Sequence, residues 1–270
     1  MLEILKDRSV LRISGIDSLK FLQGLVTNDI ENKIFSYNYL LNNQGRYLFD
    51  FFVFKENNDN FFIDLHMPLT QDLMKLTSMY KLRSNIKIED ISSGYKIIYS
   101  DEKIEGAEFS FTDPRFDKLG YRSLIKIDKM NMLGGNVENL YLADKYKYAI
   151  IDGYIDLSEG KSIPVEYGAE ELNALSYTKG CYIGQEVISR AKYQGVVRKK
   201  IYLLEFSQMP RYIEKKSEIY DEEENKIGLV CSIKDNLVIA IVREEKYLGL
   251  NKKQVIVNGQ TADIFIPPWR

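Results

Sequence analysis

Residues 177–186 read Tyr-Thr-Lys-Gly-Cys-Tyr-Ile-Gly-Gln-Glu, and this stretch constrains the interpretation of the whole chain. Cys181 lies between Gly180 and Gly184, and Lys179 precedes it by two positions. Glycine adopts backbone conformations that other residues avoid, and it allows a ligand or a second chain segment to approach closely. The pattern therefore predicts a tight loop that holds a single cysteine.

The residues after this loop predict a helix over 185–194, because apolar side chains recur there at helical spacing and Gly195 is typical of a helix end. The first amides of a helix favour a negative charge. Together with Lys179, these amides would favour the thiolate form of Cys181 and produce an accessible, reactive thiol.

The same spacing also fits a cysteine without a chemical role. Free cysteines are among the most buried residue types, and the sequence names no base partner for Cys181. His66 is the one histidine, and a thiol enzyme would require its side chain to lie within hydrogen-bond reach of Cys181. Cys231 lies in an apolar strand pattern and is expected in the core.

Before the loop, the chain reads as a mixture of short strands and helices. Strands are predicted over 10–14, 39–41, 46–54 and 61–65, with further strands between 94 and 127. Helices are predicted from the N-cap Asp17 to Asn28, from the N-cap Thr70 to Tyr80, and over 140–151. Residues 42–45 have the composition of a turn.

After Gly195 the pattern changes to strands alone. The predicted strands are 200–206, 227–233, 237–242, 254–257 and 262–266. Asn258 and Gly259 form the strongest hairpin signal in the chain. Short strands at near-regular spacing predict a small antiparallel barrel or sandwich. We therefore expect an α+β protein with one region over 1–195, made of two intertwined subdomains, and a C-terminal β-domain over 196–270.

Asp50 is the one charged residue in the aromatic strand 47–54, where it shares a face with large apolar residues. Burial of a carboxylate there is costly unless it is paired or hydrogen-bonded. Two interpretations follow. The carboxylate recognises N–H groups of a ligand, or it pairs with Arg46 or Lys55 or lies at a solvated sheet edge.

Composition narrows the classes of protein. The 270 residues include 37 Lys and Arg against 39 Asp and Glu, so no basic excess indicates direct nucleic-acid binding. Two cysteines and one histidine without ligand spacing predict no metal site. No apolar run is long enough for a membrane span. Residues 1–10 lack a signal-peptide core and contain acidic side chains, which predicts a cytoplasmic protein with reduced thiols.

Residues 177–186, followed by Ser-Arg-Ala at 189–191, resemble the YgfZ branch of the YgfZ/GcvT family, the folate-binding proteins of iron–sulfur cluster assembly. Four other segments fit the same family: FLQGLVTNDI at 21–30, LLNNQGRYLFD at 40–50, YKLRS at 80–84, and the DPR and LGYR motifs within 113–122. The resemblance covers nearly the whole chain.

The resemblance implies a three-lobed GcvT-like α+β fold with a C-terminal antiparallel β-barrel and tetrahydrofolate in a central opening. It implies an accessory factor, not an enzyme in the usual sense, that assembles or maintains iron–sulfur clusters. Its expected partners are folate and iron–sulfur client enzymes or assembly proteins, including clients that modify tRNA.

For the site, the resemblance makes Cys181 the functional thiol. The remaining candidates are expected to face or surround the folate: Asn28, Asp50, Lys179, Gln185, Glu186 and Arg190. Lys179 would tune the thiol. Arg190 would anchor a folate carboxylate, and Asn28 and Asp50 would form the opposite wall.

A tetrahydrofolate-dependent aminomethyltransferase is the alternative, because the family's transferase branch shares the fold. That branch has paired acids after a Gly-Gly turn, whereas this chain keeps Asp50 and has Phe49 at the other position. It also has a pterin-reading glutamate, whereas residues 175–180 contain no acid. One-carbon transfer needs a group that manages the proton of the substrate amine.

Overall fold

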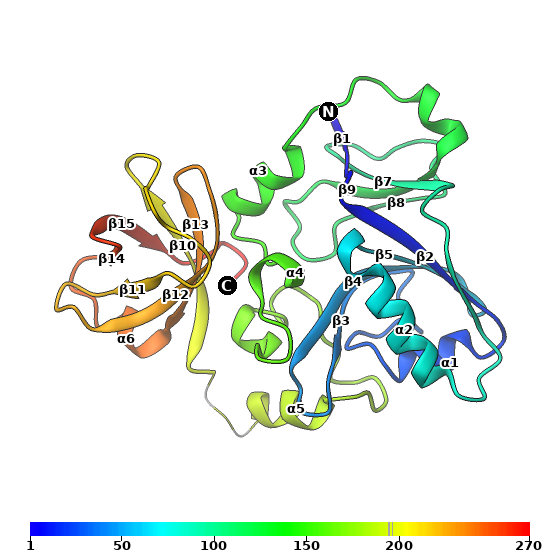
Figure 1. Cartoon of the computed structure of the whole chain (residues 1–270), viewed down its shortest axis with the longest axis horizontal. Helices are drawn as coiled ribbons and strands as arrows, with labels where there is room; N and C mark the ends of the chain where they lie inside the picture. The colour runs from blue at the N-terminus through cyan, green and yellow to red at the C-terminus, as the bar shows by residue number, and fades with distance from the viewer. Residues whose placement is uncertain (194, 196) are drawn as a thin grey trace.

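Aromatic strands of the N-terminal half form a five-stranded antiparallel sheet in the order β3-β4-β5-β2-β6. In the computed structural model, residues 1–193, 195 and 197–270 are described. The strands are β2 (Arg8–Ser14), β3 (Phe35–Leu41), β4 (Tyr47–Asn57), β5 (Asn60–His66) and β6 (Lys87–Asp90). Two helices, α1 (Ser18–Gln23) and α2 (Thr70–Lys81), bury Leu22 and Leu73 against one face of this sheet (Figure 1). The short helix η1 (Met67–Leu69) leads into α2.

A second sheet has the order β1-β7-β9-β8 and includes the first residues of the chain. Its strands are β1 (Leu2–Ile4), β7 (Tyr95–Ser100), β8 (Phe109–Thr112) and β9 (Tyr121–Lys126). Phe54 and Phe62 of the first sheet pack with Tyr99 and Tyr141 in a shared core. Helices η2 (Ile127–Met132) and α3 (Leu140–Lys147) follow.

A linking region connects the sheets to the C-terminal lobe. It contains α4 (Gly153–Asp156), η3 (Pro164–Tyr167) and α5 (Gln185–Tyr193). In Figure 1, α4 lies between the first sheet and the lobe that contains β10 to β15. This position lets α4 contact both parts of the molecule.

The C-terminal lobe is a closed barrel in the order β10-β13-β12-β11-β14-β15. Its strands are β10 (Lys199–Phe206), β11 (Glu218–Tyr220), β12 (Lys226–Lys234), β13 (Leu237–Arg243), β14 (Gln254–Val257) and β15 (Gln260–Phe265), with α6 (Glu244–Leu248) outside. The φ angles of Asn258 and Gly259 are +46° and +74°, as a two-residue hairpin turn requires. The predicted hairpin and barrel are confirmed.

Two predicted helices are too long. The helix expected from 17 to 28 ends at Gln23, because Gly24 weakens it and Val26 instead forms a bridge with Leu40. The helix expected over 140–151 ends at Lys147, and Ala149 has a φ of +52°. Helix 185–194 is observed as Gln185–Tyr193, and Gln194 lies outside the described residues.

Candidate functional site

The glycine-flanked loop is held against the end of α1. The amide of Ile183 donates to the Gly24 carbonyl over 3.4 Å, and Tyr182 is buried in the core. Gly184 has a φ of +83°, and a Cβ there would lie 2.7 Å from the Asn42 carbonyl oxygen. Glycine is therefore required at 184. At Gly180 a Cβ would meet nothing within 4 Å, so packing does not require glycine there.

The two cysteines occupy opposite environments. Cys181 is exposed, whereas Cys231 lies on β12 at 2% exposure in the core. Burial raises the pKa of the Cys231 thiol well above its ordinary value. The prediction that Cys231 is a core residue is confirmed. For Cys181, the structure matches the interpretation of an accessible thiol and not that of a buried small residue.

Lys179 fixes the loop to the chain segment that follows α1. Its Nζ donates to the carbonyls of Val26 (2.6 Å) and Asn28 (2.8 Å), and its side chain lies beside the Tyr182 ring. Burial lowers the pKa of Lys179 to about 7. The amine is therefore committed to backbone carbonyls, and its expected effect on the thiol of Cys181 stays a prediction.

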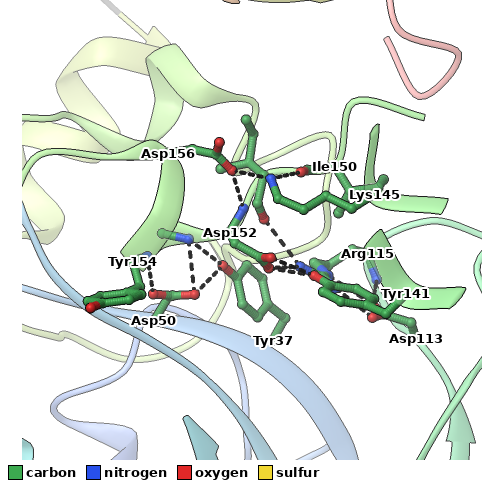
Figure 2. Close-up of polar contacts among 12 residues, drawn as sticks. Tyr37, Asp50, Asp113, Arg115, Tyr141, Lys145, Ile150, Asp152, Tyr154 and Asp156 are labelled. Atoms are coloured by element: carbon green, nitrogen blue, oxygen red, sulfur yellow. Dashed lines mark hydrogen bonds and ion pairs between the residues drawn. The ribbon is translucent and has the colours of Figure 1, made fainter. Parts of the chain in front are cut away.

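Asp50 accepts four hydrogen bonds and is 1% exposed. Its Oδ1 accepts from the Tyr47 hydroxyl (2.8 Å) and the Tyr154 amide (2.9 Å). Its Oδ2 accepts from the Tyr37 hydroxyl (2.8 Å) and the Gly153 amide (3.0 Å), as Figure 2 shows for the labelled residues. All the usual acceptor positions of the carboxylate are used.

Neither expected cation reaches Asp50, and the solvated-edge interpretation is also wrong. Arg46 donates to the Lys161 carbonyl and Lys55 to the Glu31 carbonyl. The burial cost of Asp50 is offset by two tyrosines and by the first amides of α4. Gly153 permits this contact, because a Cβ there would lie 2.5 Å from Asp50 Oδ1.

A network of buried charges lies beside Asp50 (Figure 2). Arg115 is fully buried and makes two hydrogen bonds to the Asp113 carboxylate, 2.9 and 2.7 Å long. Its Nη1 donates to Asp152 over 2.8 Å, and its guanidinium lies 4.9 Å from the ring centres of Tyr37 and Phe52. Burial acts to lower the pKa of Arg115, but the neighbouring Asp113, Tyr141 and Asp152 hold it well above its ordinary value.

This network continues into the first sheet and the barrel. Arg122 donates to Asp64, which also binds Arg8. Lys145 of α3 donates to Asp156 of α4 over 2.6 Å. Asp156 also accepts from Ser232 of β12, so one carboxylate joins α3, α4 and the barrel.

The sequence assigned no role to these buried charges. Asp64 occupies the apolar strand 61–65, and Arg115 belongs to the DPR motif. For Asp64, a charge within an apolar strand is the same sequence signal that marks Asp50.

Of the other predicted site residues, Asn28 lies in the interior, Gln185 is half-buried, and Glu186 and Arg190 are exposed. Asn28 is buried, and its Nδ2 donates to the carbonyls of Tyr37 and Asn173. Tyr37 thus contacts Asn28 through its carbonyl and Asp50 through its hydroxyl, and the Asn28 carbonyl accepts from Lys179. By contrast, Gln185 begins α5, where the exposed Glu186 and Arg190 pair with each other.

His66 has other neighbours than the thiol. Its Nδ1 lies 3.2 Å from Asp7 Oδ2, and its ring lies 5.0 Å from that of Tyr154. No contact between His66 and Cys181 occurs among the described residues. The same residues contain no group of three His, Cys, Asp or Glu side chains arranged to hold a metal ion.

The hydrogen bonds of Asp50 and Asn28 show whether these two residues fit a folate. The Asp50 carboxylate is saturated, and Asn28 Oδ1 already accepts from the Asp29 amide and from Lys33. A pterin needs free hydrogen-bonding groups at the wall of its pocket. With α4 in place, these residues do not fit a folate.

Comparisons with known proteins identify sequence relatives. No protein-family model matches the chain. The mitochondrial iron–sulfur cluster assembly factor IBA57 homolog of Mycosarcoma maydis is 30% identical over 225 residues, which covers 74% of this chain and 55% of the relative. The mitochondrial iron–sulfur cluster assembly factor IBA57 of Mus musculus is 29% identical over 229 residues, covering 73% and 64%. The chain thus spans between about half and two thirds of these relatives.

One solved structure establishes the fold. The glycine cleavage system aminomethyltransferase T from Bartonella henselae superposes with a TM-score of 0.73, covering 100% of this chain and 86% of the other, at 13% identity. The GcvT-like fold with its C-terminal antiparallel barrel is therefore confirmed. The described helices include none that is both long and apolar enough to cross a membrane.

The prediction of a cytoplasmic protein is wrong. The similar assembly factors from the fungus and the mouse are mitochondrial proteins. The prediction used the composition of residues 1–10, but these residues include β1 and the start of β2. The acidic and basic side chains of 1–10 therefore belong to strands and their connection, and their composition does not report the compartment.

Proposed function

We propose that this chain is an iron–sulfur cluster assembly factor of the IBA57 type and that it acts through the thiol of Cys181. The relatives that share about 30% of their aligned residues carry that function in their names. The observation that carries the proposal is the exposure of Cys181 on a loop fixed at Lys179 and Gly184. Such a loop presents sulfur to a partner without reorganising the core.

The proposed chemistry follows from the thiol count. Iron–sulfur clusters are commonly held by four cysteine thiolates. This chain has two cysteines, and Cys231 is buried with a raised thiol pKa. Cys181 therefore supplies one thiolate, and a partner protein supplies the other ligands while the cluster is passed on. The resemblance to the YgfZ branch supports clients that include tRNA-modifying enzymes.

Cys181→Ser is expected to lower iron–sulfur enzyme activity roughly tenfold or more in cells that depend on this chain as their IBA57-type protein, because a hydroxyl replaces the thiolate that binds iron. Cys231→Ala is the matched control, since it removes the other sulfur. The measurement is client activity normalised to the amount of client protein. Full activity with Cys181→Ser would contradict the proposal.

Reduced folate binding is the second part of the proposal, and the GcvT-like fold supports it. Because α4 saturates Asp50, we propose that tetrahydrofolate enters only when α4 withdraws. Lys215 of the barrel lobe holds the far end of α4, where its Nζ donates to the carbonyls of Ile155 and Leu157. The closed form is therefore held in part by a contact that does not involve Asp50.

Lys215→Met is expected to tighten tetrahydrofolate binding by up to about tenfold, because loss of a hydrogen bond that contributes roughly 0.5–1.5 kcal/mol at this exposed position increases the fraction with α4 released. Lys216→Met, at an exposed neighbouring position, is the control. Calorimetric titration of both variants and the wild type provides the measurement. Equal affinities would place the folate away from Asp50, and no binding in any variant would remove folate from the proposal.

The structure adds no support for the aminomethyltransferase alternative. Asp50 is the acid retained at the relevant turn, and its four hydrogen bonds leave no free acceptor for the proton of a substrate amine.

A further inference from the structure

An exposed apolar and basic surface lies where α1 begins and α2 ends. We call it the α1–α2 patch and define it as Ile16, Lys20, Phe21, Leu82 and Arg83. Leu82 is 88% exposed and Ile16 72%. A hollow of about 790 Å³ is lined by Lys20, Phe21, Leu82 and Arg83, together with Asp17 and Ser84. The patch therefore combines large apolar side chains with a concave surface.

The two chain segments of this patch are fixed to each other. Asp17 Oδ2 accepts from the Asn85 amide over 2.7 Å, and Gly15 lies so close to Asn85 that a Cβ would be 2.2 Å from its carbonyl. Leu82 follows α2 with a φ of +44°, a region that leucine rarely adopts. Because its side chain is exposed, packing of the core does not explain leucine at this position.

The charges of the α1–α2 patch favour an acidic partner. Lys20 and Arg83 line the hollow, and within the described part of the chain neither forms an ion pair. Asp17 is the one carboxylate of the lining and its Oδ2 accepts from the Asn85 amide, so the lining carries two cations against one anion. Arginine beside large apolar groups is typical of the centre of protein interfaces. A hollow accommodates a protruding side chain, whereas a membrane surface is met by a broad amphipathic face.

The patch is connected to the thiol loop through α1. Lys20 and Phe21 belong to α1, and Gly24 directly after α1 accepts from Ile183, two residues beyond Cys181. Six helical residues span about 9 Å. The patch and the loop that carries Cys181 are therefore separated by one short helix.

We propose that the α1–α2 patch docks an acidic segment of the protein that exchanges the cluster with Cys181. The segment inserts a large apolar side chain into the hollow, while its carboxylates pair with Lys20 and Arg83. This inference rests on the proposed function, because it gives the partner of Cys181 its docking surface.

A peptide-display library of random sequences, selected on the full chain, tests the docking chemistry. Selected peptides are expected to be enriched in Asp and Glu next to Leu or Phe. Lys20→Glu/Arg83→Glu is expected to weaken these peptides by roughly tenfold or more. Lys96→Glu/Lys118→Glu, with the same charge change on exposed residues of the other sheet lobe, is expected to leave their affinity unchanged.

Leu82→Ser removes the exposed side chain without a change of charge. It is expected to weaken the same peptides several-fold at an unchanged melting temperature. Peptides without acidic enrichment, or with affinities indifferent to Lys20→Glu/Arg83→Glu, would overturn the proposal. So would binding of the chain to phosphatidylglycerol vesicles through Lys20 and Arg83 with no peptide selected, because the surface would then contact a membrane.

Cellular activity separates this inference from the proposed function. If Cys181→Ser abolishes client activity and the patch variants do not lower it, the docking proposal fails and the proposed function stands. If Cys181→Ser retains full activity while acidic peptides still bind at the patch, the proposed function fails instead. Cys181→Ser and the patch variants are all expected to lower client activity. Of these, Cys181→Ser alone is expected to retain peptide binding.

Discussion

Replacement of Arg115 by methionine is expected to lower the free energy of unfolding by about 3–5 kcal/mol, because removal of one partner leaves buried charges unpaired. Arg115 compensates Asp113 and Asp152, which are both 2% exposed. Burial acts to raise the pKa of Asp152, but Arg115 and Lys145 hold it well below its ordinary value. Without Arg115, both carboxylates must be buried without this partner or take up a proton.

The geometry around Arg115 explains why methionine cannot replace its hydrogen bonds. All three guanidinium nitrogens donate, to Asp113, Asp152, Tyr141 and the Ile151 carbonyl. Methionine fills much of the volume between the Tyr37 and Phe52 rings but donates no hydrogen bond. Because α4 begins directly after Asp152, the loss of Arg115 also loosens the segment that saturates Asp50.

Chemical denaturation of the variant and the wild type measures this effect. Arg190→Met is the matched control, because Arg190 is 62% exposed and pairs with Glu186 on the surface. Such pairs contribute roughly 0–1 kcal/mol. Arg115→Met/Asp113→Asn should recover part of the loss, since it removes one unpaired charge. A loss below about 1 kcal/mol for Arg115→Met would contradict the assigned role of the network.

Much of the fold could be predicted because periodicity reports burial locally. The aromatic and apolar run in 46–54, the Asn258-Gly259 turn and the helix over 185–194 each follow from neighbouring residues. Helix ends were less predictable. Val26 continues the apolar pattern of α1 but pairs with Leu40, a partner that only the tertiary structure supplies. The division of the chain at 195 and 196 stays a prediction, and Val196 lies outside the described residues.

The loop of the candidate site could be predicted from the sequence, but the hydrogen-bond partners of its side chains could not. The glycine spacing correctly indicated the need for glycine at 184. The partners of Asp50 could not be predicted, because Gly153 and Tyr154 are about a hundred residues away and donate through backbone amides, which every residue except proline carries. The commitment of Lys179 to two carbonyls escaped prediction for the same reason. The functional roles of Cys181 and the other candidate residues stay predictions.

Stability is expected to rise with pH above 7 through Lys179. Burial lowers the pKa of this amine to about 7 in the folded chain, against about 10.4 when it is unfolded. Between these values the unfolded state binds more protons than the folded state. The free energy of unfolding therefore increases with pH across this window, by up to about 1.4 kcal/mol per pH unit.

The structure explains how a neutral Lys179 remains useful to the fold. A neutral amine keeps two N–H groups, and the Val26 and Asn28 carbonyls accept two hydrogen bonds. Lys179→Met is expected to abolish the Lys179 contribution to the pH dependence, so the difference in stability between wild type and variant should grow in favour of the wild type from pH 7 to 9. The measurement is urea denaturation at each pH, which cancels the titration of groups common to both chains.

Lys179→Arg separates charge from side-chain length. Arginine stays protonated throughout this range, so its variant should lack the rise with pH and be less stable than the wild type, most strongly at pH 9. If the wild type and Lys179→Met differed by a constant amount from pH 6 to 9, Lys179 would not titrate in this window. If neither Lys179→Met nor Lys179→Arg shows the increase of unfolding free energy with pH, the loop carrying Cys181 is held by an amine that releases its proton near neutral pH.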